Sequence, residues 1–265
     1  MSTLDNLILF RGAGELASGA IRRLAVAGFP VIALETAEPL CVRRTVSFAS
    51  AIYDSEIEIE GIRGKFYEGI DEVTEMIIGR EIAVMIDPEG STIQKLSPKI
   101  IVDARMLKNN PDTISNIAPV VIALGPGYAA PKDAHYVIET SRGHDLGRVI
   151  TNGSALKNTG VPGEVGGETI RRVLRSPVSG KFESAKNLGD MVRALQVVGN
   201  INGIEVKTEI SGMLRGLIYD GVEISEGTKI GDVDPRGNSD YLHTISDKAN
   251  AVAGGVMEAV LRSIQ

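Results

Sequence analysis

The first half of the chain repeatedly places a short, uninterrupted apolar run between more polar segments. Six runs rich in Ile and Val stand out: Leu7–Phe10, Val31–Leu34, Ile82–Ile86, Ile100–Val102, Val120–Leu124 and Tyr136–Ile138. Because every position is apolar, such a run is typical of a strand buried on both faces, as in a parallel sheet covered by helices. Glu15–Ala27 carries apolar residues at helical spacing and stops at Gly28. We therefore predict an α/β fold with a Rossmann-like, doubly wound parallel sheet.

The second half contains two similar stretches, RSPVSGKF at Arg175–Phe182 and EISGMLRG at Glu209–Gly216. Their Ser-Gly pairs lie 32 residues apart, and each stretch is followed by turn residues and a further apolar segment. Short strands with turn glycines at regular spacing predict a small β domain. A duplication of this form looks like the barrel-sandwich hybrid of biotinyl and lipoyl domains, and an ordinary β-meander with two similar turns is the alternative.

We predict two domains from this change of character. The first is a Rossmann-like nucleotide-binding domain over residues 1–168, completed by a C-terminal helix at residues 246–264. The second is the barrel-sandwich hybrid over residues 169–237. The polar stretch Ser141–Glu168 is interpreted as a long functional loop that leads to the boundary.

The segment after the first predicted strand has the pattern G-x-G-x-x-A, and its three specified positions are Gly12, Gly14 and Ala17. Such glycines allow a tight turn and let a pyrophosphate approach a helix N-terminus, while the small alanine permits close packing of helix and strand. Glu35 ends the second strand, 23 residues beyond Gly12, where a carboxylate would accept hydrogen bonds from a ribose. A packing turn without a ligand is the alternative.

Several polar residues and glycines follow predicted strands, and parallel strands bring their carboxyl ends to one edge of a sheet. Arginines there can hold a phosphate or a pterin ring through paired hydrogen bonds. The candidate ligand-binding residues are Arg11, Gly12, Gly14, Ala17, Glu35, Arg43, Arg44, Gly125, Gly127 and Arg142. His144 is the candidate for acid–base catalysis, because imidazole suits proton transfer near neutral pH. A hydrogen-bonding role for His144 within its loop is the alternative.

Composition excludes several other classes of protein. The 28 Lys and Arg against 34 Asp and Glu give a net charge of −6, which argues against a general nucleic-acid binder. Three scattered histidines and one cysteine, Cys41, provide neither a disulfide nor a metal-ligand pattern. Cys41 is either a thiol activated by Arg43 and Arg44 or a small buried residue. No apolar run reaches 18 residues and no signal peptide is evident, so we expect a cytoplasmic protein without a membrane partner.

Longer phrases of the sequence carry a family resemblance. These phrases are RGAGELASGAIRRL, ETAEPLCVRRTVSFASAIYD, LGPGY followed by IETSRGHDLGRVI, and KIGDVDPRG with TISDKANAVAGGV. Across essentially the whole chain they resemble the YqeB family, accessory proteins of a selenium-dependent molybdenum hydroxylase system. A fainter similarity in the first domain is to the xanthine dehydrogenase accessory proteins that deliver molybdenum cofactor. The resemblance implies maturation of a molybdenum hydroxylase client.

The expected ligand is therefore a small anionic nucleotide, either a molybdopterin dinucleotide or an NAD-like dinucleotide. An NAD-dependent oxidoreductase would need the same glycine pattern, and a nucleotide-free assembly platform would need neither ligand. In biotinyl and lipoyl carriers the hairpin between the two halves presents a lysine. The corresponding segment here, Gly199–Gly203, contains none, so we expect no attached biotin or lipoate.

Overall fold

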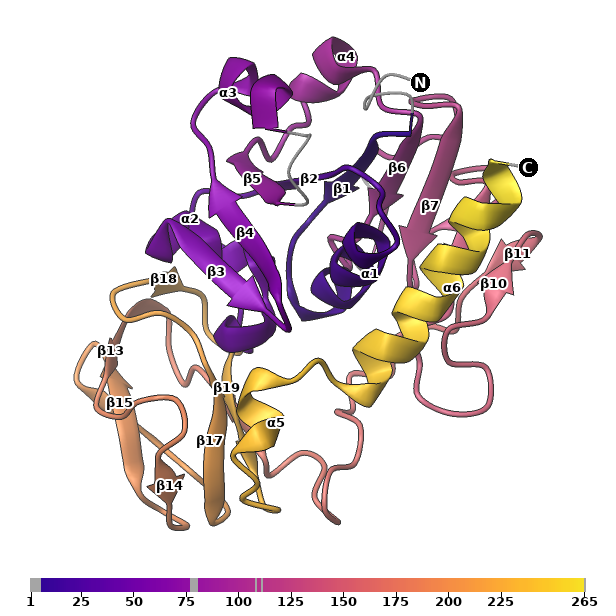
Figure 1. The fold of residues 1–265 in the computed structure, drawn as a ribbon. Coiled ribbons are helices and arrows are strands. Elements are labelled where there is room, and N and C mark those ends of the chain that lie inside the picture. Colours follow the sequence, from indigo (N-terminus) through magenta and orange to yellow (C-terminus); the bar gives the residue numbers. More distant parts are fainter. Residues whose placement is uncertain (1–5, 77–80, 108, 111, 265) are drawn as a thin grey trace. The chain divides into compact units, whose positions relative to one another are not determined.

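The computed structural model describes residues 6–76, 81–107, 109–110 and 112–264 (Figure 1). The chain divides into two units. The first consists of Met1–Pro39, Ser47–Thr159 and Ile245–Gln265, and the second of Leu40–Val46 and Gly160–Thr244. Each unit has its own sheets and its own buried apolar residues, and each is described in turn.

A nine-stranded sheet forms the centre of the first unit. Its order is β10 (Val149–Ile150), β9 (Tyr136–Ile138), β7 (Val120–Leu124), β6 (Ile100–Asp103), β1 (Ile8–Arg11), β2 (Val31–Glu35), β5 (Ile82–Ile86), β4 (Ile62–Phe66) and β3 (Glu56–Ile59). All six apolar runs predicted from the sequence are strands of this sheet, and they pair in parallel with one another. Read as β5-β2-β1-β6-β7-β9, their order corresponds to the 3-2-1-4-5-6 order of doubly wound sheets. The prediction of an α/β fold with a large parallel sheet is confirmed.

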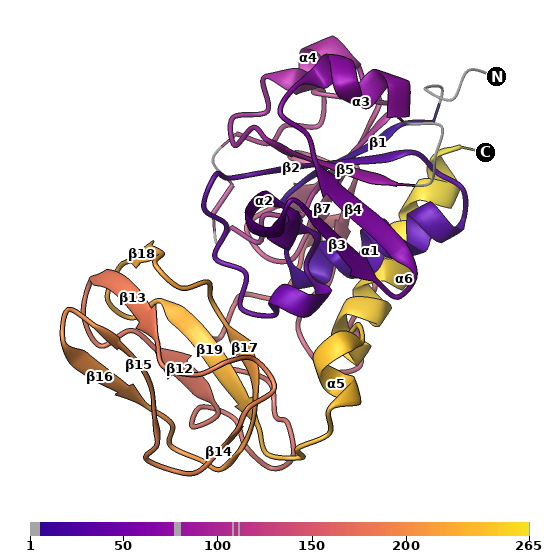
Figure 2. The ribbon, with the colours of Figure 1, turned by 60° about the vertical axis from the view of Figure 1, so that its left-hand side comes forward.

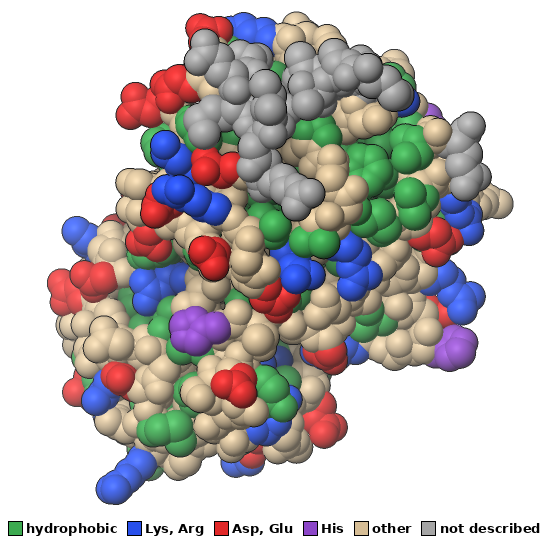
Figure 3. Space-filling model, in the orientation of Figure 1, with side chains coloured by type: hydrophobic (Ala, Val, Ile, Leu, Met, Phe, Trp, Pro, Cys, Tyr) green, Lys and Arg blue, Asp and Glu red, His purple; other side chains and the backbone are tan. Residues whose placement is uncertain are grey.

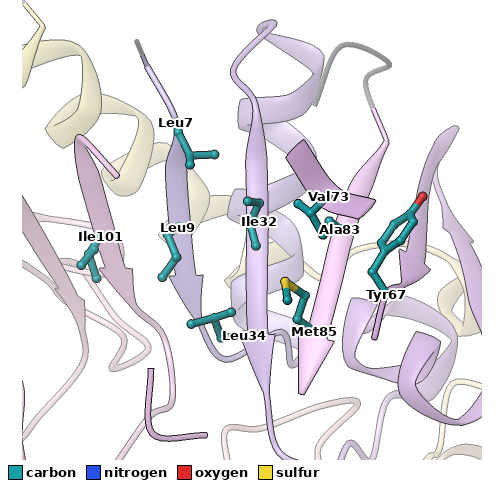
Figure 4. Packing of buried hydrophobic residues seen from close by; sticks show 9 residues of the cluster. All are labelled: Leu7, Leu9, Ile32, Leu34, Tyr67, Val73, Ala83, Met85 and Ile101. Carbon is teal, nitrogen blue, oxygen red and sulfur yellow. The ribbon is translucent and has the colours of Figure 1, made fainter. Parts of the chain in front are cut away.

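Helices cover both faces of this sheet (Figure 2). One face carries α1 (Glu15–Val26) and α6 (Asp247–Ser263), and the other carries α3 (Ile70–Met76) and α4 (Thr92–Leu96). Leu9 and Leu34 belong to a buried cluster on the α3 and α4 side (Figure 4), against which Ile93 of α4 packs. Ile8 and Phe10, which alternate with Leu9 along β1, are also fully buried. Burial on both faces explains why these strands are apolar at each position before the polar residues Arg11, Glu35 and Asp103 that end β1, β2 and β6.

Shorter elements complete the first unit. They are the 3-10 turn η2 (Phe48–Ser50), helix α2 (Ala51–Asp54) and a two-stranded sheet of β8 (Ala129–Ala130) and β11 (Gly153–Ser154). Strands β3 and β4 form an antiparallel hairpin, and β4 joins β5 in parallel. This hairpin was not predicted, because its strands lack the continuous apolar runs of the central strands.

The second unit consists of two four-stranded antiparallel sheets. The first has the order β12 (Val173–Arg175), β19 (Lys229–Asp234), β17 (Gly212–Leu217) and β14 (Met191–Val192). The other has the order β16 (Ile204–Lys207), β15 (Val197–Ile201), β13 (Gly180–Ser184) and β18 (Glu223–Ile224). The unit also contains the 3-10 turn η1 (Arg44–Val46) and helix α5 (Asp240–His243).

The predicted duplication reaches the level of individual strands and hydrogen bonds. A shift of about 32 residues relates β12 to β16, β13 to β17, β14 to β18 and β15 to β19, so each sheet reproduces the strand order of the other. The Gly189 N–H donates to the Leu214 carbonyl at 2.9 Å, and the equivalent Gly221 N–H donates to the equivalent Phe182 carbonyl at 2.8 Å. The second unit is therefore built from two copies of one four-strand pattern.

The division of the chain differs from the prediction in three places, one of which is residues 238–244, which lay outside both predicted domains and join the second unit. The segment Leu40–Val46, which we assigned to the first domain, clusters with the second unit. Its Val42 carbonyl accepts a hydrogen bond from the Leu217 N–H of β17 at 2.9 Å. Residues 160–168 also join the second unit, where the Gly163 carbonyl accepts from the Arg172 guanidinium at 2.9 Å. The spacing of apolar residues in the sequence indicates neither of these two hydrogen bonds, so the prediction missed them.

Gly254 and Gly255 of α6 provide a matched pair of substitutions that tests the packing of this helix. A methyl group at Gly255 would overlap the Gly147 carbonyl oxygen, whereas one at Gly254 would meet only the flexible Arg23 side chain, at 3.3 Å. We expect Gly255→Ala to lower the free energy of unfolding by about 1–3 kcal/mol. Gly254→Ala should leave it unchanged or raise it by up to about 1 kcal/mol, because alanine favours a helix. Urea denaturation measures both, and equal effects would contradict the assigned packing.

Candidate functional site

The glycine loop joins the end of β1 to the start of α1. Gly12 has a φ of +99°, and a Cβ there would lie 3.1 Å from the Ala104 backbone, so the chain after β1 touches the chain after β6. At Gly14, no described atom lies within 4 Å of where a Cβ would be, apart from its chain neighbours. Ala17 is 1% exposed, within the buried side of α1. The Cβ position of Gly14 at the start of α1 is therefore open, and phosphate binding there stays a prediction.

Glu35 ends β2, and its carboxylate faces this loop. One oxygen, Oε2, accepts a hydrogen bond from the Ala13 N–H at 2.8 Å, and Oε1 accepts from the Thr36 N–H at 2.9 Å. Glu35 therefore holds the glycine loop against the end of β2. Its contact with a ribose stays a prediction, and a ribose hydroxyl would share the carboxylate with the loop.

Arginines and carboxylates form a network at the ends of β1 and β6. Arg105 donates two hydrogen bonds to the Asp103 carboxylate, from Nη2 to Oδ2 at 2.6 Å and from Nε to Oδ1 at 3.1 Å. Asp112 bridges the two arginines, since Arg11 Nη2 donates to Oδ2 at 2.7 Å and Arg105 Nη2 donates to Oδ1 at 2.6 Å. The Thr113 hydroxyl also donates to Asp103. Sequence reasoning selected Arg11 but missed Asp112, which lies 101 residues further along the chain.

Tyr128 is a second site residue that the sequence did not reveal. Its side chain is among the largest fully buried ones, and its hydroxyl forms no hydrogen bond with any other described residue. Burial raises the pKa of Tyr128, and the charge of nearby Asp103 raises it further. The hydroxyl is therefore a protonated donor beside the charged network.

The predicted anion site at Gly125, Gly127 and Arg142 is assembled only in part. Gly125 and Gly127 have φ angles of +76° and +104°, and a Cβ on Gly125 would lie 2.7 Å from the Thr140 hydroxyl. The Gly125 N–H donates to the Ile138 carbonyl at 2.9 Å. The loop after β7 therefore lies against the residues that follow β9, with one of its donors already used.

Arg142 makes a bidentate ion pair with Asp247, in the first turn of α6, at 2.6 and 3.0 Å. Both side chains are exposed, and His144 is exposed as well. Glu139 fixes the start of this loop, because its carboxylate accepts from the Ser141 N–H at 2.6 Å. The ligand role of Arg142 and the catalytic role of His144 stay predictions.

Arg43 and Arg44 belong to the second unit, which corrects their placement among the strand ends of the first. Arg43 donates to the Tyr241 carbonyl at 2.8 Å, and the Arg44 guanidinium lies 4.4 Å from the centroid of the Tyr219 ring. Cys41, in the same segment, is 7% exposed. These contacts hold the segment onto its own unit, and a ligand role for Arg43 and Arg44 stays a prediction.

The described residues contain no group of three or more His, Cys, Asp or Glu side chains placed to hold a metal ion. In the same part of the chain, no helix has both the length and the apolar character needed to cross a membrane. Acidic and basic side chains are interspersed on the face shown in Figure 3.

Asp87, which follows β5 at the carboxyl edge of the sheet, accepts hydrogen bonds from the turn that leads into α4. Its carboxylate accepts from the backbone N–H groups of Gly90, Ser91 and Thr92 at 2.8–3.0 Å, and also from the Ser91 and Thr92 hydroxyls. Burial opposes its charge, but the hydrogen bonds from Thr92 and Ser91 outweigh burial and lower the pKa of Asp87. Asp87 thus fixes the turn that leads into α4.

Comparison with known proteins adds one clear relative. No family model matches the sequence. The chain is 46% identical over 255 residues to the Escherichia coli K12 protein YqeB, which is described as uncharacterized. The match covers 96% of this chain and 47% of that protein, so the chain spans about half the length of its relative.

Similarity to solved structures is weak. An aspartoacylase family protein from Mesorhizobium loti matches with a TM-score of 0.29 and 14% identity, over 86% of this chain and 84% of that one. A succinylglutamate desuccinylase/aspartoacylase from Rhodobacter sphaeroides matches with a TM-score of 0.22 and 18% identity, over 24% and 22% of the two chains. Likenesses at these scores carry no argument about function.

Asp87 predicts a pH-dependent stability difference. Because its pKa is lower in the folded chain than in the unfolded one, its stabilisation is present above pH about 4 and is lost as the pH falls through the folded value. We expect Asp87→Asn to lower the free energy of unfolding at pH 7 by about 1.5–3 kcal/mol. The difference should shrink below pH about 4. Urea titrations at several pH values measure it, and the exposed neighbour Glu89 provides the control Glu89→Gln. A difference that is constant with pH would contradict this role.

Proposed function

The 46% identity to YqeB over 96% of the chain supports assignment to the YqeB family, and on that premise we propose that the first unit binds a dinucleotide or related nucleotide at the carboxyl ends of its parallel strands. One observation carries this proposal. The glycine loop lies between β1 and β6, where the strand order reverses direction. In doubly wound sheets, ligands bind in the crevice at this switch point, with phosphates at the helix N-terminus.

We propose further that the ligand is a molybdopterin dinucleotide and that the chain is a cytoplasmic maturation factor for a selenium-dependent molybdenum hydroxylase. This part rests on the family resemblance alone. In the second unit, the duplicated four-strand pattern supports a barrel-sandwich hybrid. Its β15–β16 turn, at Asn202 and Gly203, presents no lysine, so we propose that this unit works without attached biotin or lipoate.

Gly14→Val tests the nucleotide site. Gly14 has a φ of −67° and open space around its Cβ position, so valine should fold normally while its branched side chain blocks an approaching phosphate. A nucleotide at 100 times its Kd stabilises the parent by about 2.7 kcal/mol, and the variant should lose that gain. Thermal unfolding with NAD and with molybdopterin cytosine dinucleotide measures it.

Gly69→Val is the matched control, because it introduces the same side chain where the nearest contact is the flexible Glu72 side chain, at 3.8 Å. It should retain ligand stabilisation. Equal stabilisation of the parent and Gly14→Val would contradict the phosphate role of the loop. Oxidation or reduction of NAD with turnover would favour the oxidoreductase, and no stabilisation by either nucleotide would favour a nucleotide-free platform.

A second measurement tests maturation of the client. In a host that lacks its own copy of this protein, we expect the purified hydroxylase to contain several-fold less pterin-bound molybdenum. The parent chain should restore the metal content and Gly14→Val should not. Metal analysis of the purified client gives the result, and full molybdenum content without this protein would reject a maturation role.

A further inference from the structure

We propose that Arg11 and Arg105 form a subsite for a phosphate or carboxylate group of the ligand, and that Asp112 is a built-in carboxylate that the ligand displaces. This subsite would form part of the proposed nucleotide site, so the inference rests on the proposed nucleotide-binding function. Arg11 ends β1, and Arg105 follows β6 by two residues. The close contact between Gly12 and the Ala104 backbone brings the two arginines to the same point on the sheet edge.

Asp112 sits between the arginines as a ligand oxyanion would. Its two carboxylate oxygens accept from different guanidinium groups, one from Arg11 at 2.7 Å and the other from Arg105 at 2.6 Å. Paired donors of this kind are the usual recognition of carboxylates and phosphates by arginine. The geometry therefore already displays a two-point anion site, with an acidic side chain of the chain itself as the occupant.

The two carboxylates of the network differ in how firmly they are held. Asp103 is 0% exposed, lies in β6 and is gripped by Arg105 and Thr113, so it is a permanent counter-ion. The Asp112 side chain is 42% exposed and lies outside any helix or strand. The charges of the two arginines and the two carboxylates cancel within this network, and removal of Asp112 leaves the network with one net positive charge. Asp112 is thus the group that can exchange with a ligand.

The charge of Asp112 persists at physiological pH. Burial disfavours ionisation, but the hydrogen bonds from Arg105 and Arg11 outweigh it and lower the pKa of Asp112 to about 2. A ligand anion therefore competes with another anion at neutral pH. Such competition weakens the binding of single anionic groups and favours a ligand with several of them, such as a pyrophosphate.

Tyr128 provides an independent indication that a further group belongs here. Its hydroxyl is buried close to Asp103 and Arg105, which both act on its pKa, but it makes no hydrogen bond of normal geometry with a described residue. A buried hydroxyl without a partner costs stability, so such groups usually meet a ligand or an ordered water. An oxyanion held by Arg105 would offer this hydroxyl an acceptor.

Asp112→Asn tests the exchange with pyrophosphate and malonate as probes on the full chain. Removal of the competing charge should tighten pyrophosphate binding by roughly ten- to hundredfold, measured by calorimetry. Glu258→Gln, at the exposed ion pair with Arg262 on α6, removes the same charge and should change nothing. Adding Arg11→Gln to Asp112→Asn should cancel the gain. Tighter binding of malonate as well would show that the subsite accepts carboxylates in addition to phosphates.

Thermal unfolding keeps the test decisive if Asp112→Asn is unstable. Without an anion, the unfolding temperature of Asp112→Asn should then be lower than that of the parent. Addition of pyrophosphate should raise the unfolding temperature of the variant by more than it raises that of the parent. Equal responses of the parent, Asp112→Asn and Glu258→Gln to both probes would overturn the proposal, as would a gain that survives Arg11→Gln. If dinucleotide binding depends on Gly14 but Asp112→Asn leaves pyrophosphate binding unchanged, the subsite alone is refuted. A pyrophosphate gain without any dinucleotide binding supports the subsite and refutes the nucleotide function.

Discussion

The close approach of the chain after β1 to the chain after β6 is the contact on which the candidate site depends. Strand β1 pairs in parallel with both β2 and β6, and Arg11 lies opposite Leu34 on one side and Asp103 on the other. At Gly12, which follows, a Cβ would lie only 3.1 Å from the Ala104 backbone, and the φ of +99° also disfavours any residue with a side chain. The glycine at this position lets the glycine loop and the charged network lie side by side at one edge of the sheet.

The elements that the sequence predicted are those with a local physical signature. Strands buried on both faces must be apolar at each position, so their runs, such as Val120–Leu124, could be located without a template. The duplicated unit could be located because each copy needs the same turns. The Ser-Gly pairs at 179–180 and 211–212 place Gly180 and Gly212 at φ angles of +147° and +156°, where glycine is strongly preferred.

Features that depend on contacts between distant residues were missed or misplaced. Arg43 and Arg44 follow β2 in sequence, but Val42 binds the backbone of β17 and takes them into the second unit. No spacing rule connects Asp112 with Arg11, because only the folded chain brings them together. Glu35 was selected as a ribose contact, which stays a prediction, and its bond to the Ala13 N–H was not predicted. Sequence reasoning thus located the sheet edge and several of its residues but not their partners.

Carboxylates of the chain itself already accept hydrogen bonds from several donors at this sheet edge. Glu35 accepts from the glycine loop, and Asp112 bridges Arg11 and Arg105. Without Asp112 the buried Arg11 would lose this ion pair, whereas Arg105 would keep its pair with Asp103. An unpaired buried charge is strongly destabilising, so these internal partners let the unit fold without a ligand. The same partners must be given up or shared on binding, which lowers the affinity for any single anionic group. On the proposed function, a ligand that engages the helix N-terminus and the arginine pair together would therefore bind more tightly than a fragment that reaches only one of them.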